Sequence, residues 1–288
     1  MKLYTIESET KQHTAVEGKD GKLYTLGSLG IDVKDMNDLI FHFDELSPLI
    51  VKGLEADAPK TEAANYIIKA PIPVPLQDII CLGVNYRSHV EETVDVLDFT
   101  KKADTVYFSK RVNTANDPDG TIPVYDFVDS LDYEVELGVV IKKDALNVSV
   151  NEAAKYILGY TIINDVSARN LQSKHQQWYR GKSLDGYTPM GPCIVTADEI
   201  SDAHDLDISC YVNGEKRQDS NTKYMITSIE EAVSELSRGM LLKAGTIIAT
   251  GTPGGVAMGM KPPVYLKKGD IIKCGISGIG SLENRVGQ

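Results

Sequence analysis

The sequence predicts a mainly β protein with some α-helix, in which a small α+β unit precedes a larger strand-rich domain. From about residue 79 onward, short apolar runs such as VELGVVI, GYTIIND and TIIAT alternate with Gly, Pro and Asp turns. Helical periodicity is confined to a few segments. The chain of 288 residues is 42% hydrophobic and 25% charged, which is typical of a fully folded globular protein.

The opening unit combines a hairpin with a helix. The segments KLYTI and KLYTL flank EGKDG, whose Gly and Asp residues favour a hairpin turn. In VKDMNDLIFHFDEL, apolar residues at three- and four-residue intervals predict one amphipathic helix. The segment APIPVPLQD carries prolines that interrupt regular structure. We therefore predict a small N-terminal domain over residues 1–70 and a main domain over residues 71–288.

Two helices interrupt the strands of the main domain. One is predicted in VNEAAKYI, directly after Ser149. The other is predicted in SIEEAVSELSRGM, where Ile229, Val233 and Leu236 fall on one face behind a Ser cap. No tandem repeat or low-complexity tract is present.

The charge and the apolar runs exclude several classes of protein. A net charge of −11 argues against a nucleic-acid partner, because such binding depends on clustered Lys and Arg. The first residues contain no apolar core of signal-peptide length, and no apolar run reaches the roughly 20 residues that cross a bilayer. We therefore expect a cytoplasmic protein without a membrane partner. The four cysteines have no spacing typical of a zinc site, and we predict no disulfide.

Acidic side chains alternate along the segment DYEVELGVVI. In a strand, Asp132, Glu134 and Glu136 would point to one side, while the apolar residues between them face the other. Adjacent ionised carboxylates repel each other, and burial makes their uncompensated charge costly. A bound cation would relieve that cost. The alternative is that this face meets solvent.

Asp165 ends the apolar run GYTIIND, where the chain turns into VSARNLQ. It could simply cap that turn. Together with Glu134 and Glu136 it would form an all-oxygen ligand set that suits Mg²⁺ or Mn²⁺, with Ca²⁺ as a substitute and zinc disfavoured. Three ligands would leave coordination positions for water or for the adjacent carboxylate and keto oxygens of a 2-oxo acid.

The segment CLGVNYRSHVEE offers acid–base chemistry. If a helical turn begins after Tyr86, then His89 and Glu92 lie three residues apart on one face, where the carboxylate can orient the imidazole. That pair could activate water. The alternative is an ordinary ion pair on a helix surface.

Two later loops offer binding groups. Downstream of Gln172, the segment WYRGKSLDGYTPMGP brings Arg180 and Lys182 into a glycine-containing loop, where Lys182 could stabilise an oxyanion or could simply be exposed. In IIATGTPGGVAMG, the hydroxyls of Thr250 and Thr252 could bind a carboxylate. The latter loop lacks the Lys of a nucleotide-binding P-loop, so a nucleotide is not indicated.

Five of these blocks, GVNYRSHVEE, DYEVELGVVI, NDVSARNLQ, GKSLDGYTPMGP and ATGTPGGV, occur in the order found in the fumarylacetoacetate hydrolase family. The resemblance covers about residues 77 to 286. It implies a catalytic domain built as a mixed β-sandwich roll, a homodimer, and Mg²⁺ or Mn²⁺ bound by Glu134, Glu136 and Asp165.

The resemblance also implies roles for the other candidate residues. His89 and Glu92 resemble the family's water-activating dyad, and Lys182 and Gln172 resemble its oxyanion and substrate contacts. Thr252 resembles the residue that holds a substrate carboxylate. We also expect Tyr86 and Arg180 to contact the substrate. The charged segment 91–102 is a candidate lid.

These features predict a metal-dependent hydrolase that cleaves a carbon–carbon bond in a small 2-oxo acid, an acylpyruvate or β-diketo acid, through a metal-stabilised enolate. The same enolate could arise in an oxaloacetate decarboxylase or in an isomerase acting on products of aromatic-ring cleavage. A catalytically inactive metal- or ligand-binding protein of the same fold is the non-enzymatic alternative.

Overall fold

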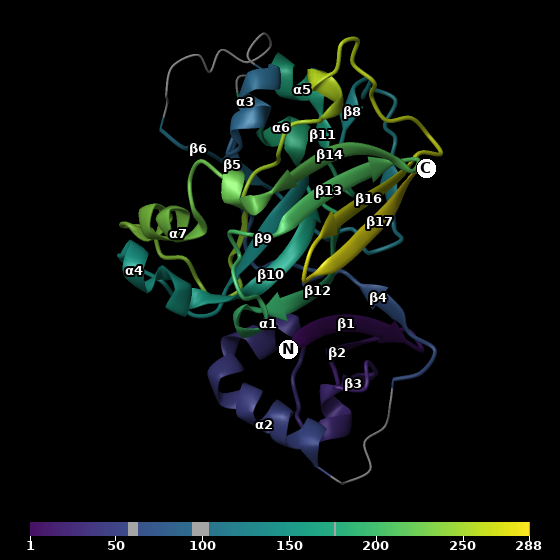
Figure 1. Cartoon of the computed structure of the whole chain (residues 1–288). Helices are drawn as coiled ribbons and strands as arrows, with labels where there is room; N and C mark the ends of the chain where they lie inside the picture. Colours follow the sequence, from purple (N-terminus) through teal and green to yellow (C-terminus); the bar gives the residue numbers. More distant parts are fainter. Residues whose placement is uncertain (57–62, 94–103, 176, 288) are drawn as a thin grey trace.

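The computed structural model describes residues 1–56, 63–93, 104–175 and 177–287. Within them, the largest unit is a ten-stranded sheet in the order β3-β2-β1-β12-β10-β9-β15-β5-β6, with β4 paired on β1 (Figure 1). Its strands are β1 (Lys2–Ser8), β2 (Lys11–Glu17), β3 (Leu23–Thr25), β4 (Ile67–Lys69), β5 (Ile79–Gly83), β6 (Val106–Lys110), β9 (Val135–Ile141), β10 (Ile157–Asn164), β12 (Met190–Thr196) and β15 (Ile247–Ala249).

Two smaller sheets complete the β structure of the described residues. A five-stranded sheet has the order β14-β13-β16-β17-β7, and β8 pairs with β11. The strands are β7 (Thr121–Pro123), β8 (Leu131–Asp132), β11 (Ser167–Ala168), β13 (Asp207–Val212), β14 (Glu215–Asn221), β16 (Ile271–Ile276) and β17 (Gly280–Gly287). Strands outnumber helices, so the predicted mainly β fold with some α-helix is confirmed.

The core lies on both faces of β9 and β10, in which every residue is buried. One face packs against β13 and β16 of the five-stranded sheet. On the other face, Val140 and Ile163 pack in one cluster with Leu39 and Ile40 of the N-terminal region. Burial on both faces explains why these strands are almost continuously apolar.

The N-terminal strands form a three-stranded meander, so the prediction of a single hairpin is wrong. KLYTI in β1 and KLYTL around β3 both lie beside β2, and EGKDG turns only from β2 into β3. The strand β2 was not predicted because its sequence, KQHTAVE, is largely polar. Because β1 also pairs with β12, the meander extends the large sheet. The division of the chain at residue 70 stays a prediction.

The helix predicted in VKDMNDLIFHFDEL is two helices, α1 (Met36–Phe41) and α2 (Phe43–Glu55). The backbone of His42, with ψ of 19°, leaves the helical region between them. VNEAAKYI forms the short helix α4 (Val150–Ala153), followed by a 3₁₀ turn. The predicted α7 (Ile229–Ser237) is confirmed, and Ser228 and Glu231 form its capping box.

Three short helices gather at one end of the large sheet: α3 (Arg87–Thr93), α5 (Arg169–Lys174) and α6 (Tyr179–Lys182) (Figure 1). The chain enters α3 from β5 and approaches α5 from β10. Most of the candidate lid, residues 94–102, lies outside the described residues. Within the described part of the chain, no helix combines the length and apolar character needed to cross a membrane.

Candidate active site

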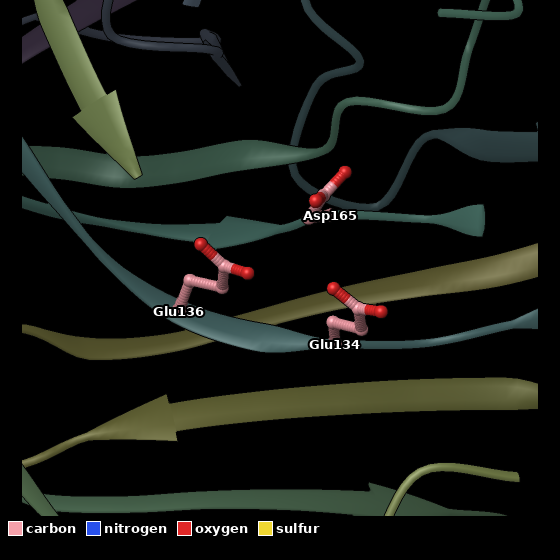
Figure 2. Close-up of side chains that lie close together, drawn as sticks. All are labelled: Glu134, Glu136 and Asp165. Atoms are coloured by element: carbon pink, nitrogen blue, oxygen red, sulfur yellow. The ribbon is translucent and has the colours of Figure 1, made fainter. Parts of the chain in front are cut away.

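The candidate site residues lie together at the end of the large sheet where α3, α5 and α6 gather, because neighbouring strands begin or end there. Glu134 precedes β9 and Glu136 lies within it, whereas Asp165 follows the last residue of the antiparallel neighbour β10. Figure 2 shows the three carboxyl groups side by side. One oxygen from each lies within 4.8 Å of the others.

The three carboxylates are buried. Glu134, Glu136 and Asp165 are 5%, 2% and 0% exposed, so the alternative that this strand face meets solvent is wrong. Such a set of hard oxygen donors, held close together away from water, fits a divalent cation that prefers oxygen ligands. The burial therefore favours a metal centre over an ordinary acidic surface.

Glu134 and Asp165 are already paired with cations. The Lys182 ammonium lies 2.7 Å from a carboxylate oxygen of each. Asp165 also pairs with Lys110 at 2.6 Å, and Glu134 with Arg169 at 2.6 Å. Burial alone raises the pKa of Glu134, but Lys182 and Arg169 outweigh it and hold that pKa well below its usual range. Lys182 is 2% exposed, which excludes an ordinary surface lysine.

Glu136 differs from its two neighbours. Its carboxylate accepts a hydrogen bond from the Gly251 N–H at 2.9 Å, and no Lys, Arg or His among the described residues forms an ion pair with it. Burial, followed by the negative charges of Asp165 and Glu134, raises its pKa well above the usual value. A buried carboxylate without a cation is costly, so the donor set fits a metal ion here.

Asp132, the first acidic residue of the alternating segment, has a different task. It pairs with Arg169 Nε at 2.9 Å and accepts hydrogen bonds from the backbone N–H groups of Ala257 and Met258. These contacts use both of its oxygens. Asp132 therefore anchors Arg169 and the chain after the glycine-rich loop, and it is not part of the ligand triad.

His89 and Glu92 form the predicted pair on α3. His89 Nδ1 lies 2.7 Å from one oxygen of Glu92, and the Gly255 N–H donates to the other oxygen at 2.7 Å. His89 is 6% exposed, which excludes an ion pair on an open helix surface. Glu92 fixes the orientation of the imidazole, and the loop in turn fixes Glu92.

The loop of residues 250–256 closes another side of the site. Thr250 Oγ1 donates to the Leu137 carbonyl at 2.9 Å, so this hydroxyl supports β9. Thr252 Oγ1 donates to the Val135 carbonyl at 2.9 Å and accepts from Gln218 Nε2 at 2.7 Å. The Thr252 N–H has no acceptor among the described residues and belongs to a residue that lines the cavity. Its role in binding a substrate carboxylate stays a prediction.

The remaining candidates divide into two groups. Gln172 lines the cavity, and its side-chain oxygen accepts from Arg169. Arg180 is exposed, stacks over Phe127 and does not line the cavity, because two residues along a helix point to nearly opposite sides and Lys182 points inward. Tyr86 is fully buried and is not among the residues that line the cavity, and its hydroxyl has no hydrogen-bond partner among the residues that the structure describes. Neither Arg180 nor Tyr86 is placed to touch a ligand here.

The cavity between these groups has a volume of about 20 Å³, enough for a water molecule. Phe108 and Trp178 line it, with ring centroids 5.2 Å apart. A cavity of about 740 Å³ lies beside α2 and the N-terminal strands, but it shares no lining residue with the smaller one. Buried charge, rather than volume, therefore identifies the candidate active site.

Sequence reasoning missed three residues of the site: Lys110, Arg169 and Gln218. Lys110 and Gln218 are 0% exposed, and Arg169 is 4% exposed. Lys110 ends the strand VYFSK, where a charge after an apolar run is a weak signal. Gln218 lies in the polar segment EKRQDSN, whose pattern offers no signal of burial.

The family profile described as "Fumarylacetoacetate (FAA) hydrolase C-terminal" matches residues 78–287. "Oxaloacetate tautomerase YisK" of Bacillus subtilis (strain 168) is 43% identical over 221 residues, which cover 76% of this chain and 73% of that protein. "Oxaloacetate tautomerase Fahd2a, mitochondrial" of Rattus norvegicus is 37% identical over 236 residues, covering 82% of this chain and 74% of the relative.

A solved structure is similar over the full length. The fumarylacetoacetate hydrolase (EaFAH) from psychrophilic Exiguobacterium antarcticum superposes with a TM-score of 0.83 and 37% sequence identity. The similarity covers 100% of this chain and 99% of that one. The predicted roll-type fold and the resemblance based on the five sequence blocks are thereby confirmed.

Proposed function

Because the chain belongs to the fumarylacetoacetate hydrolase family, we propose that it is an enzyme that uses a divalent metal to interconvert the keto and enol forms of a small 2-oxo acid. The observation that carries this proposal is the buried triad beside the oriented His89–Glu92 pair. Within the triad, Glu136 has no ion pair with any Lys, Arg or His that the structure describes. Oxaloacetate is the first candidate substrate, since both relatives described above are named oxaloacetate tautomerases.

Glu134, Glu136 and Asp165 would hold Mg²⁺ or Mn²⁺, with Ca²⁺ as a substitute. Bound there, the metal would act as a Lewis acid toward the 2-keto oxygen of the substrate. Glu92 holds His89 Nδ1, so His89 exchanges a proton with the substrate through Nε2. Phe108 and Trp178 line the cavity, and their apolar rings would disfavour competing water beside the reacting carbon.

In the enolising direction, His89 removes a proton from C3, and the electron pair of that C–H bond forms the C2=C3 double bond. The carbonyl oxygen takes up the displaced electron pair, and His89 then transfers the proton that it removed from C3 to this oxygen, which returns the imidazole to its neutral form. Lys182 supplies positive charge beside this oxygen, where negative charge develops. No water is consumed and no carbon–carbon bond breaks, so the reaction is an isomerisation.

The second candidate function is hydrolysis of an acylpyruvate, which was the leading prediction from the sequence. The His89–Glu92 pair favours it because an imidazole held by a carboxylate can equally deprotonate water. The similar solved structure is also named as a hydrolase. Both reactions share the enolate and differ in whether water attacks a second carbonyl.

The two candidates are separated by their products. Enol oxaloacetate is mixed with the protein and Mn²⁺, and loss of its ultraviolet absorbance is followed while pyruvate and CO₂ are measured. A tautomerase accelerates the loss of enol without releasing either product. Pyruvate and CO₂ from oxaloacetate would indicate decarboxylation instead, and pyruvate plus an acid from an acylpyruvate would indicate hydrolysis.

The assignment of the base is tested with His89→Gln, for which we expect a fall in kcat of roughly 10²- to 10⁴-fold. His175→Gln is the matched control, because His175 is exposed at the end of α5. Equal activity of the His89→Gln variant and the wild type would remove His89 from the mechanism. A chelator should abolish turnover, and added Mn²⁺ should restore it. Full activity in the presence of the chelator would show that turnover does not need a metal.

A further inference from the structure

Gln218 on β14 contacts both the strand that bears the carboxylates and the loop that bears Thr252. Its Oε1 accepts a hydrogen bond from the Val135 N–H at 3.0 Å. Its Nε2 donates to Thr252 Oγ1 at 2.7 Å and to the Pro253 carbonyl at 2.8 Å. The side chain is 0% exposed, so these bonds replace all contact with water.

The chemistry of the amide permits only this orientation. With Oε1 and Nε2 exchanged, the amide nitrogen would face the Val135 N–H, and the amide oxygen would face the Pro253 carbonyl. Each of those pairs would set like groups against each other. The orientation of Gln218 is therefore fixed by its neighbours.

The three residues form a closed ring of hydrogen bonds. Thr252 Oγ1 accepts a hydrogen bond from Gln218 Nε2 and donates a hydrogen bond to the Val135 carbonyl at 2.9 Å. The Val135 N–H closes the ring by donating a hydrogen bond to Gln218 Oε1. Both backbone groups of Val135 are thus held, and Val135 is the residue between Glu134 and Glu136.

The backbone around Gln218 explains how it reaches the loop. The pairing of β13 with β14 shifts after Cys210, which faces Gln218, so Arg217 is an extra residue in β14. Such bulges bend a strand and redirect the following side chain. The loop packs directly on this bulge, because a Cβ on Gly255 would lie 2.0 Å from the Arg217 carbonyl oxygen.

We propose that Gln218 is a positioning residue that sets the separation of Glu134 and Glu136 through Val135 and fixes the loop against them. This inference rests on the proposed metal-dependent function. The ring also commits the Thr252 hydroxyl proton to Val135, so a substrate carboxylate would meet the Thr252 N–H rather than the hydroxyl. Gln218 thereby supports metal binding and substrate orientation without touching either ligand.

The test is the affinity for Mn²⁺, measured by titration calorimetry on the full chain without substrate. Gln218→Met keeps the length of the side chain and removes all three hydrogen bonds. We expect its Kd for Mn²⁺ to rise about tenfold, within the range found for residues that support metal ligands. Gln12→Met, at an exposed position on β2, is the matched control and should bind as the wild type does.

A second variant, Gln218→Glu, guards against poor folding of Gln218→Met. Its carboxylate still accepts from Val135 but repels the Pro253 carbonyl and cannot donate to Thr252. We expect weaker Mn²⁺ binding and a higher KM for the 2-oxo acid. Binding by both Gln218 variants within twofold of the wild type would overturn the inference.

A double-mutant cycle separates positioning from a general loss of stability. Thr252→Val breaks the same ring, so the loss of Mn²⁺ affinity in Gln218→Met/Thr252→Val should be smaller than the product of the single losses. Independent, multiplicative losses would contradict action through the ring. If the wild type itself binds no Mn²⁺, both the proposed function and this inference fall. If it binds and the Gln218 variants match it, only the inference falls.

Discussion

Two halves of the carboxylate cluster solve the problem of buried charge differently. On the cation side, Glu134 and Asp165 contact Lys182, Lys110 and Arg169. On the loop side, the carboxylate of Glu136 accepts a hydrogen bond from the Gly251 N–H and forms no ion pair with a described Lys, Arg or His. The same residue type therefore has a lowered pKa at position 134 and a raised pKa at position 136. The cation side is internally neutralised, whereas the loop side is suited to an added cation.

Removing Lys182 should have the largest effect, because it strips the cation side of the ammonium that bridges two buried carboxylates. Lys182→Met should lower the free energy of unfolding by about 3–5 kcal/mol. It should also reduce kcat by roughly 10²-fold or more, the scale found for removal of an oxyanion donor. Urea unfolding and the enol assay measure both. Lys268→Met, at an exposed position, should change neither. A Lys182 variant with wild-type stability would show that the cation side is not held by this charge.

The two glutamates should respond differently to neutralisation in the absence of metal. Glu134→Gln removes a partner of Lys182 and Arg169 and should cost about 3 kcal/mol. Glu136→Gln removes a buried carboxylate that pairs with no cation in the described part of the chain, so the metal-free protein should be as stable or more stable. Thermal unfolding in a chelator measures both effects. Added Mn²⁺ should stabilise the wild type but neither variant. Equal destabilisation by both substitutions would abolish the distinction between the two sides.

The loop side should be sensitive to the backbone rather than to charge. Gly255 has φ of +105°, and a Cβ there would collide with Arg217. Gly255→Ala should therefore destabilise the protein by about 1–3 kcal/mol and weaken Mn²⁺ binding. Gly214→Ala is the control, since Gly214 has φ of +81° but no atom within 4 Å of its added Cβ. Equal effects of both substitutions would show that the loss comes from backbone strain alone and not from the packing of the loop.

The partly exposed pair of His204 and Glu230 should have the smallest effect on stability. Glu230 hydrogen bonds His204 and raises the pKa of His204 above its ordinary value of 6.5, while the pKa of Glu230 is lowered. The histidine contribution is therefore fully present below about pH 6.5 and is lost as the pH rises through the folded-state pKa. Since His204 is 32% exposed, His204→Gln should cost under about 1 kcal/mol at pH 5.5 and nothing at pH 8.5. A loss that persists at pH 8.5 would indicate packing rather than charge.

The sequence predicted the parts of the site that follow from local pattern. Period-two alternation brought Glu134 and Glu136 to one side, and three-residue spacing brought His89 to Glu92. Both expectations needed only the geometry of one strand or one helical turn. The predicted α7 was equally local, because the Ser228 cap and the apolar face lie within one segment.

The rest depended on contacts between distant segments. Gln218 reaches Val135 across 83 positions of the chain, and neither residue has a neighbour in sequence that signals this contact. The three-stranded N-terminal meander was missed because pairing with β1 and β3 outweighs the weak strand propensity of KQHTAVE. Arg180 was assigned to the site with Lys182 because the sequence alone did not define the direction of each side chain on α6.

The hydrogen bonds from Gly251 to Glu136 and from Gly255 to Glu92 have a consequence for the order of assembly during synthesis. Residues separated by 115 and 163 positions must meet before these carboxylates are held. The acidic half of the site therefore leaves the ribosome long before the loop that secures it. Until then Glu136 favours a solvated arrangement, so β9 should join the sheet late, after its neighbouring strand β15 has been translated.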